Sequence, residues 1–340
     1  MKKACLGFLL VSALTGCGDN IHDGDDDGNG SGSQQPEPGL DATGTYRIHS
    51  TFDIATNMPG NSGAFVNSLI AATDDADDPM KWVLDQLLAQ MQPGSFKSVL
   101  QAAEPFVAGY LNDRLEDLAP DLTSTIVTLG QHVAAMTKHF GVNEKLVVST
   151  ADQAYISSMT ADGVRFTLDG NVTDLKFADH DIDDVYVDSV LVTLATGPKL
   201  QIGDHALPLP YGKIIRMGLD AAIIPVLDPS AHDLADLLDH LVNCTGVGQN
   251  ISTAVGVGSA AFWAAACHTG MQGAAGYVYE QIAAHDSLLT FHILGSARAS
   301  DANDDRKIDK LEFGEWSGTL SYGATDTTLA QPATFDGTRM

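Results

Sequence analysis

The amino-acid sequence predicts an α+β fold, in which an antiparallel β meander or curved sheet packs on amphipathic and buried helices. Three observations favour this class. Residues 78–140 carry apolar side chains at spacings of three and four, as amphipathic helices do. Residues 145–202 alternate apolar and polar side chains between short turns, which is typical of antiparallel strands. The alternation returns after residue 288, and we expect both strand regions to share one sheet.

The individual elements follow from these periods. Asp78-Pro79 is a helix start, because Asp caps a helix and Pro fits its first position. Pro105 should kink the second helix. The predicted helices are 78–91, 96–115, 122–140, 212–224, one that Asp228-Pro229 caps and that carries the leucines of 234–241, and a buried pair in 250–283. The predicted strands are 44–52, 145–150, 153–160, 164–168, 172–177, 185–195, 200–202, 288–294, 316–322 and 328–335.

The first residues form an export signal. Lys2 and Lys3 precede the apolar run 4–14, which is too short to span a bilayer permanently. Leu14-Thr15-Gly16-Cys17 resembles the lipobox of bacterial lipoproteins. That resemblance implies cleavage before Cys17, diacylglycerol on its sulfur, and palmitate or a similar acyl chain on the new amino terminus. It also implies anchoring in the cell envelope, with the outer membrane favoured because Gly18 follows the cysteine.

Composition divides the chain into three parts: a signal peptide at 1–16, the lipidated Cys17 with a disordered acidic tether at 17–40, and a single α+β domain at 41–340. The formal net charge is −26, so nucleic acid and anionic membrane surfaces repel the chain. Of four cysteines, Cys5 leaves with the signal and Cys17 takes the lipid. Cys244 and Cys267 remain, and we expect a disulfide between them. The alternatives are two buried thiols or a reactive Cys267 beside His268.

The segment 301–313 carries the most specific spacing in the chain. Oxygen-bearing side chains stand at positions 1, 3, 5, 9 and 12, and an apolar residue stands at position 8. This spacing resembles the calcium loop of the EF-hand family, in which alternate residues present oxygens to a hard cation. The resemblance implies that Ile308 points into a core and that Phe313 anchors the exit. It implies Ca²⁺ as the cofactor, with the ligands Asp301, Asn303, Asp305, the backbone carbonyl of Lys307, Asp309 and Glu312.

Two features depart from that family. Position 6 is normally Gly, because the chain turns there with a positive φ, but here it is Arg306. The flanks, 289–293 and 314–320, read as strands and turns instead of helices. We therefore expect a lone calcium loop between two strands, with weak affinity of the order of 10⁻⁴–10⁻³ M.

Motifs for catalysis are weak. The Gly-x-Ser-x-Gly and His-Glu-x-x-His patterns do not occur. His232, Asp236 and His240 are spaced for one helix face, where a metal is possible but a solvated polar face is the simpler interpretation. We therefore expect a calcium-binding, lipid-anchored envelope protein that is non-enzymatic, with an apolar small molecule or lipid as its candidate ligand. The alternatives are an envelope or extracellular hydrolase and a structural or protein-interaction module.

Overall fold

The computed structural model describes residues 39–56, 58, 119–152, 154–195, 197–256, 258–284 and 288–340. The described residues from 40 to 340 belong to one compact unit. The predicted signal peptide, nearly all of the tether and the predicted helices 78–91 and 96–115 lie outside the described residues.

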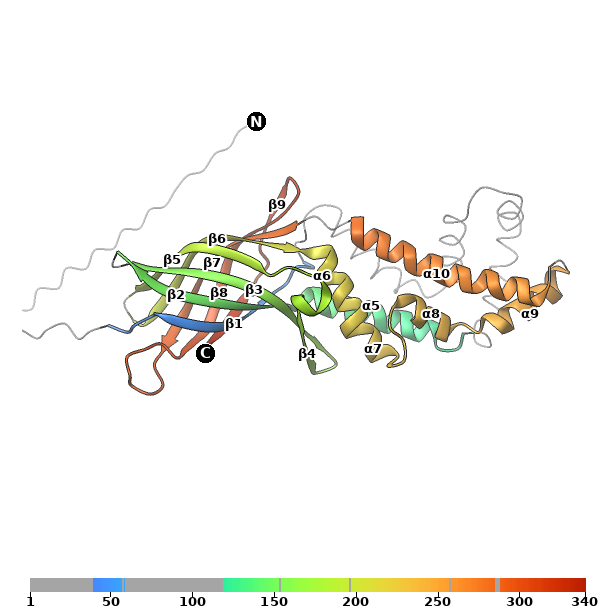
Figure 1. Ribbon diagram of the computed structural model, residues 1–340, viewed down its shortest axis with the longest axis horizontal. Coiled ribbons are helices and arrows are strands. Elements are labelled where there is room, and N and C mark those ends of the chain that lie inside the picture. The colour runs from blue at the N-terminus through green and yellow to red at the C-terminus, as the bar shows by residue number, and fades with distance from the viewer. Residues whose placement is uncertain are drawn as a thin grey trace, which may run out of the picture. The chain divides into compact units, whose positions relative to one another are not determined.

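Eight strands form a closed antiparallel barrel (Figure 1). The ring closes because the last strand, β10, pairs antiparallel with both β1 and β8. Two short strands extend the ring: β4 (Asn171–Lys176) pairs with β3, and β9 (Thr325–Thr328) pairs with β8. In ring order the eight strands are β1 (Gly44–Phe52), β2 (Phe140–Ala151), β3 (Ala154–Leu168), β5 (Val185–Ala195), β6 (Lys199–Pro210), β7 (Leu288–Ser300), β8 (Lys310–Tyr322) and β10 (Thr334–Arg339).

The predicted fold class is therefore wrong. The sheet is a closed barrel that dominates the described part of the chain, and it is not a curved sheet laid on helices. The expectation that both strand regions share one sheet is confirmed. Alternation reveals neighbouring strands only, whereas closure depends on pairs such as Thr51 with Thr334, which no local pattern reports.

Irregular pairing bends the strands around the interior. The expected turn at Asp162-Gly163 is instead part of one continuous strand, β3, and the register with β2 shifts there, between Asn143 and Glu144. Further shifts occur in the β3–β5, β6–β7, β7–β8 and β8–β10 pairs. Such bulges increase twist and curvature locally, so they account for closure of a sheet that the sequence predicts as an open meander.

Aromatic side chains fill the barrel. The Trp316 and Phe335 rings lie 4.4 Å apart, and those of Phe52 and Phe291 lie 4.5 Å apart, centroid to centroid. Eight strands leave an interior that side chains can fill or that can hold one small ligand. The largest fully buried side chains include Trp316, Tyr46, Phe52, Phe140, Phe166 and Phe291.

One carboxyl group lies in this interior. Glu144 is fully buried, and its Oε2 accepts a 2.5 Å hydrogen bond from Ser50 Oγ, which itself accepts from Trp316 Nε1 at 3.0 Å. Its other oxygen has no hydrogen-bond partner among the described residues. Loss of solvent raises the pKa of Glu144 to about 7, against the lowering effect of the Ser50 hydrogen bond.

Helices pack at the barrel end where β6 finishes and β7 begins. The helix α5 (Leu122–Lys138) precedes β2, and Ile54 N–H donates to the Thr137 carbonyl at 3.1 Å. The expected helix 212–224 is three pieces, α6 (Tyr211–Gly218), a π-helical turn η2 (Leu219–Ile223) and α7 (Ile224–Leu227). A 3₁₀ turn, η1 (Phe177–His180), follows β4.

The remaining helices are α8 (Leu234–Leu241), α9 (Cys244–Val255) and α10 (Ala260–Ala284). Asp233 caps α8, not Asp228 as predicted, because its side chain accepts from the N–H of Asp236. The pair α9–α10 is less buried than expected, and Phe262 is 47% exposed. None of the described helices is long and apolar enough to cross a membrane.

A substitution at Gly295 tests the packing of the barrel interior. The Trp316 ring lies directly over Gly295, so a Cβ there would collide with ring atoms Cζ3 and Cε3. We expect Gly295→Ala to lower the free energy of unfolding by roughly 1–3 kcal/mol through overpacking, measured by chemical denaturation. The control is Gly273→Ala in α10, where a Cβ meets nothing within 4 Å and helix propensity should hold or raise stability. Equal stability of the two variants would contradict this packing.

A second test concerns Glu144. The folded state keeps its proton more tightly than the unfolded state, so this group stabilises the fold at acidic pH. That stability is lost as pH rises from the ordinary Glu value through about 7. Between pH 5 and pH 8 the free energy of unfolding of the wild type should therefore fall by about 3 kcal/mol relative to that of Glu144→Gln, because the Gln side chain does not titrate. Urea unfolding at both pH values measures it, with Glu315→Gln, exposed on β8, as control. A pH-independent difference would refute the buried proton.

Candidate functional site

The predicted calcium loop connects β7 to β8 at the barrel end opposite the helices α5 and α6, since β7 runs away from its pairing with Pro210 toward Ser300. Residues 301–309 form no strand, although Lys307 makes an isolated bridge. The expectation of strands on both flanks is therefore confirmed, and the loop joins two neighbouring strands of the ring.

Side-chain oxygens at loop positions 1, 3 and 5 each bind backbone N–H groups further along the loop. Asp301 Oδ2 accepts from Arg306 N–H at 2.7 Å, and its Oδ1 accepts from Asn303 N–H at 3.2 Å. Asn303 Oδ1 accepts from Asp305 N–H at 3.0 Å, and Asp305 Oδ1 accepts from Lys307 N–H at 2.8 Å. These turns curl the backbone around the oxygens that the EF-hand resemblance assigns to the ion.

Two more observations define the electrostatics of the loop. Asp309 Oδ2 accepts from Ala302 N–H at 2.9 Å, which brings position 9 back to the loop start. Desolvation acts to raise the pKa of Asp301, but backbone N–H groups of residues 303–306 outweigh it and hold that pKa below its usual value. A carboxylate kept ionised by fixed donors suits a hard cation.

The segment just before β1 and the end of β10 hold this loop. Asp41 N–H donates to the Arg306 carbonyl at 2.7 Å, and Ile308 N–H donates to the Asp41 carbonyl at 3.1 Å, forming a short parallel bridge. Arg339 Nη1 donates to the Ile308 carbonyl at 3.3 Å. Ile308 itself is fully buried, so its predicted inward orientation is confirmed.

Positions 6 and 13 turn with positive φ. Arg306 has φ +69°, as the family pattern predicts for this position, with the strain of a side chain where Gly is usual. Phe313 has φ +52° and is 77% exposed, so it does not anchor the exit of the loop by packing into the interior, contrary to the expectation from the family. Its ring instead lies under the Arg298 guanidinium, 4.9 Å from the centroid.

Glu312, the predicted closing ligand, has another partner. Arg298, its neighbour across β7 and β8, donates from Nη2 to Glu312 Oε2 at 2.6 Å. The hydrogen bond and charge of Arg298 lower the pKa of Glu312. The residues thus fit a calcium loop at positions 1, 3, 5 and 9, while the carboxylate at position 12 is engaged on the strand.

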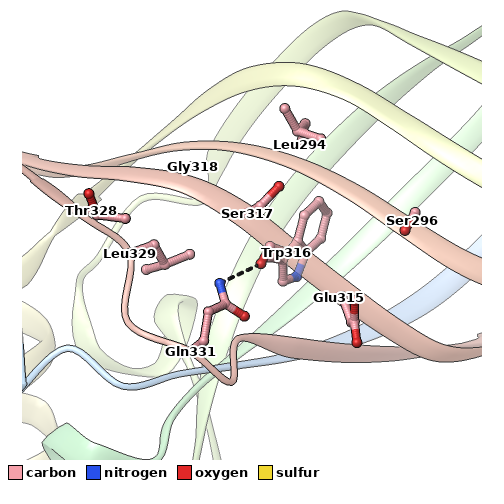
Figure 2. A pocket seen from close by; sticks show the side chains of 9 residues that line it. All are labelled: Leu294, Ser296, Glu315, Trp316, Ser317, Gly318, Thr328, Leu329 and Gln331. Carbon is pink, nitrogen blue, oxygen red and sulfur yellow. Dashed lines mark hydrogen bonds between the residues drawn. The ribbon is translucent and has the colours of Figure 1, made fainter. Parts of the chain in front are cut away.

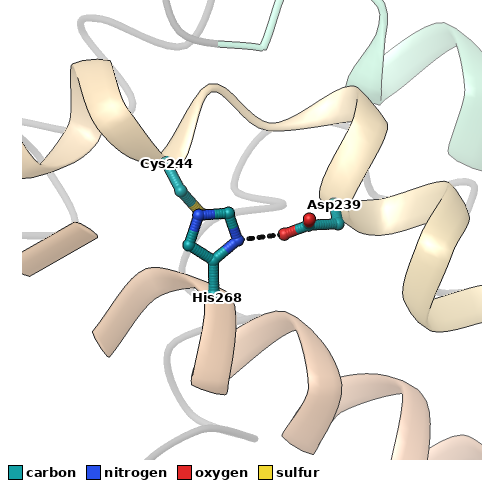
Figure 3. A group of neighbouring side chains, drawn as sticks. All are labelled: Asp239, Cys244 and His268. Carbon is teal, nitrogen blue, oxygen red and sulfur yellow. Dashed lines mark hydrogen bonds and ion pairs between the residues drawn. The ribbon is translucent and has the colours of Figure 1, made fainter. Parts of the chain in front are cut away.

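A second group of polar side chains lies among the helices α8, α9 and α10. His268 Nδ1 hydrogen-bonds to Asp239 Oδ1, and Figure 3 shows the ring between Asp239 and Cys244. One ligand atom of each of these three residues lies within 4.8 Å of the other two. Cys244 is bonded to Cys267 in a disulfide, so its sulfur is no thiolate ligand in this state and the group forms no metal site.

The spacing of His232, Asp236 and His240 does not produce a shared face. His232 lies before α8, and its Nδ1 is 3.6 Å from Asp236 Oδ2. His240 Nδ1 instead bonds to Asp228 Oδ2 at 2.7 Å, and this hydrogen bond raises the pKa of His240. Sequence reasoning missed the Asp239–His268 contact, because 29 residues separate the partners and no spacing rule links them.

The described part of the protein carries two pockets of about 450 Å³ each, and only the first lies at these polar groups. One is lined by Asp121, Asp239, His240, Cys244 and His268. The other lies over β7, β8 and residues 328–331 on the barrel wall (Figure 2), where Gln331 Nε2 donates to the Trp316 carbonyl at 3.0 Å. The second pocket carries no titratable group other than Glu315 among its lining residues.

Comparisons with protein-family models, curated proteins and solved structures find no match for this chain. No activity, ligand or partner therefore comes from a relative. The calcium loop and the Asp239–His268–disulfide group stand on their geometry and chemistry alone.

Proposed function

We propose that the protein is a calcium-binding, lipid-anchored protein of the cell envelope that acts without enzymatic chemistry, as a structural or protein-interaction module. The observation that carries the proposal is the loop 301–309. Its side-chain oxygens are organised by backbone hydrogen bonds as a calcium loop requires, and Ile308 is buried beneath it.

The position of the loop suggests what the ion does. The loop binds the entry of the barrel at Asp41 and the end of its last strand at Arg339, besides joining β7 to β8. A cation on Asp301, Asn303, Asp305, the Lys307 carbonyl and Asp309 would fix these segments together. Calcium is thus proposed as a staple of the closed sheet instead of a signal.

The interior supports a structural role over carriage of an apolar molecule. Aromatic side chains pack within the barrel at centroid distances of 4.4–4.5 Å in its tightest pairs. On the outside, Val172, Tyr186 and Leu191 are more than half exposed on β4 and β5. Exposed apolar side chains mark a partner-binding surface where they form one contiguous patch. These three lie opposite Thr167, Thr160 and Ile156, spread along β3, so they do not by themselves identify such a surface.

The hydrolase alternative gains one observation. An aspartate lies beside His268 in a pocket, which is the arrangement of a general base with its orienting group. Among the hydrogen bonds between described residues, neither His240 nor His268 meets a hydroxyl nucleophile. A hydrolase therefore stays the second candidate.

Calcium should raise the thermal stability of the full chain. With affinity of the order of 10⁻⁴–10⁻³ M, roughly 10 mM calcium should add about 1–3 kcal/mol and shift Tm by a few degrees. Asp301→Asn should remove most of this shift, because it deletes a ligand charge. Differential scanning calorimetry with calcium and with chelator measures it.

The matched control is Asp326→Asn, exposed on β9 and outside the loop, which should keep the full calcium shift. Glu312→Gln tests whether the position 12 carboxylate leaves Arg298 for the ion. If it does, this variant should also lose most of the shift. An Asp301→Asn protein that keeps the wild-type shift would exclude the loop as the site.

The lipid anchor is tested separately. Cys17→Ser removes the sulfur that would carry diacylglycerol, so the protein should leave the membrane fraction and appear in the soluble envelope fraction. Two or more acyl chains anchor stably, whereas an unacylated chain has no such attachment. Metabolic labelling with palmitate and membrane fractionation measure the effect. A Cys17→Ser protein that stays labelled and membrane-bound would contradict the proposal.

A further inference from the structure

We propose that the Cys244–Cys267 disulfide is redox-active: it exchanges with an external dithiol, and His268, positioned by Asp239, stabilises the Cys244 thiolate released in the exchange. This goes beyond the proposed calcium and anchoring functions, neither of which uses these residues.

The geometry places His268 as the base, Asp239 as its orienting group and the Cys244 sulfur next to one another. His268 Nδ1 is hydrogen-bonded to Asp239 Oδ1, and Figure 3 shows the other ring nitrogen facing the Cys244 side chain. The ligand atoms of the three residues lie within 4.8 Å of one another. A thiolate beside an imidazole that a carboxylate orients is the arrangement that activates cysteine nucleophiles. In this protein the Asp239–His268 pair lies beside the Cys244–Cys267 disulfide.

The helix α9 adds to this effect. Cys244 is its first residue, and Asn243 caps the helix by accepting from Gly246 N–H at 2.9 Å. The positive end of a helix dipole favours a negative charge, and thiolates at helix N-termini are more acidic than free cysteine. The helix and His268 therefore favour the same ionised sulfur.

Burial decides which sulfur is attacked. The pocket of about 450 Å³ is lined by Cys244 and His268 and not by Cys267. Within the disulfide, Cys244 is 2% exposed, whereas Cys267 in α10 is half-buried and is the more exposed residue. An incoming thiolate therefore attacks Cys267 Sγ. The Cys244–Cys267 bond breaks, Cys244 leaves as the thiolate, and a mixed disulfide forms on Cys267. Exchange is faster when the leaving thiol is more acidic.

The second step completes the electron balance. The remaining thiol of the dithiol, as its thiolate, attacks its own sulfur in the mixed disulfide and expels the Cys267 thiolate. The external dithiol is thereby oxidised to a disulfide, and the protein disulfide is reduced by the same two electrons. The two protons that the dithiol gives up are available to the imidazole of His268 and to the protein thiolates.

Other charges act on the same pocket. Asp121, at the start of α5, and Asp239 oppose a thiolate, whereas His240 and His268 favour it when protonated. His240 is held by Asp228 through a 2.7 Å hydrogen bond. Of the two histidines, His268 is the one grouped with the Cys244 sulfur, so its removal should have the larger effect.

The test is the redox equilibrium of the full chain with reduced and oxidised glutathione, read by thiol alkylation and mass spectrometry. We expect the wild type to be reduced measurably within the accessible glutathione ratios. His268→Gln should lower the equilibrium constant for reduction about tenfold, which is about 30 mV. Asp239→Asn should act in the same direction, because it removes the partner of the imidazole. His232→Gln, 86% exposed and outside the group, is the control and should behave as wild type.

A second readout separates this role from a structural one. In the reduced protein, the pH dependence of alkylation at Cys244 should lie below that of an ordinary cysteine, and His268→Gln should move it upward. His268 and Asp239 side chains are 47% and 43% exposed, so both variants should fold, which circular dichroism checks. A wild type that stays oxidised at every glutathione ratio would overturn the proposal. Variants that reduce and alkylate exactly as wild type would overturn it as well.

Discussion

Closure of the sheet depends on one short strand, β10, because it pairs with β1 on one side and β8 on the other. Without it the ring would open between β1 and β8. Its last residue, Arg339, donates to the carbonyls of Thr43 and Ile308, at 2.8 and 3.3 Å. The strand that closes the barrel thus also fixes the segment before β1 and the loop 301–309.

The consequence is a coupling between loop and barrel. The loop turns on its own hydrogen bonds, but Ile308 is buried, and Asp41 bridges to the backbone around it. Anything that orders residues 301–309 therefore orders the seam among β1, β8 and β10. A flexible surface loop would not have this effect, because its ends alone would be joined to the sheet.

Local periodicity predicted the strands well where pairing is local. The strands 44–52 and 185–195 have the predicted bounds, since alternation continues over their whole length. It failed at Asp162-Gly163, where Gly and Asp indicate a turn but the chain passes through a bulge. Closure was out of reach, because pairing of Thr51 with Thr334 depends on accumulated twist and not on any neighbouring residues.

Local spacing likewise predicted some features of the candidate sites and missed others. Spacing within 13 residues was enough to predict the buried Ile308 and the positive φ of Arg306, while calcium binding by the loop stays a prediction. It could not show that Glu312 faces Arg298, because that contact arises from strand register between β7 and β8. The Asp239–His268 pair and the buried Glu144 were equally inaccessible, since both require knowing which helix faces meet and which strand faces point inward.

The Arg298–Glu312 pair also bears on how strongly calcium can act. For Glu312 to close the site, its carboxylate must leave a 2.6 Å hydrogen bond to Arg298, so the ion gains only the difference between the two interactions. Arg306 adds strain, and Lys307 adds positive charge. At about 1 mM calcium, affinity of 10⁻⁴–10⁻³ M would add roughly 0.4–1.4 kcal/mol to the free energy of unfolding.

The Cys244–Cys267 disulfide, by closing its loop, adds roughly 3 kcal/mol to the free energy of unfolding in the entropy model. The covalent bond is thus the larger constraint, and it acts on the helices, whereas the proposed calcium ion would only adjust the seam of a barrel that its strands already close.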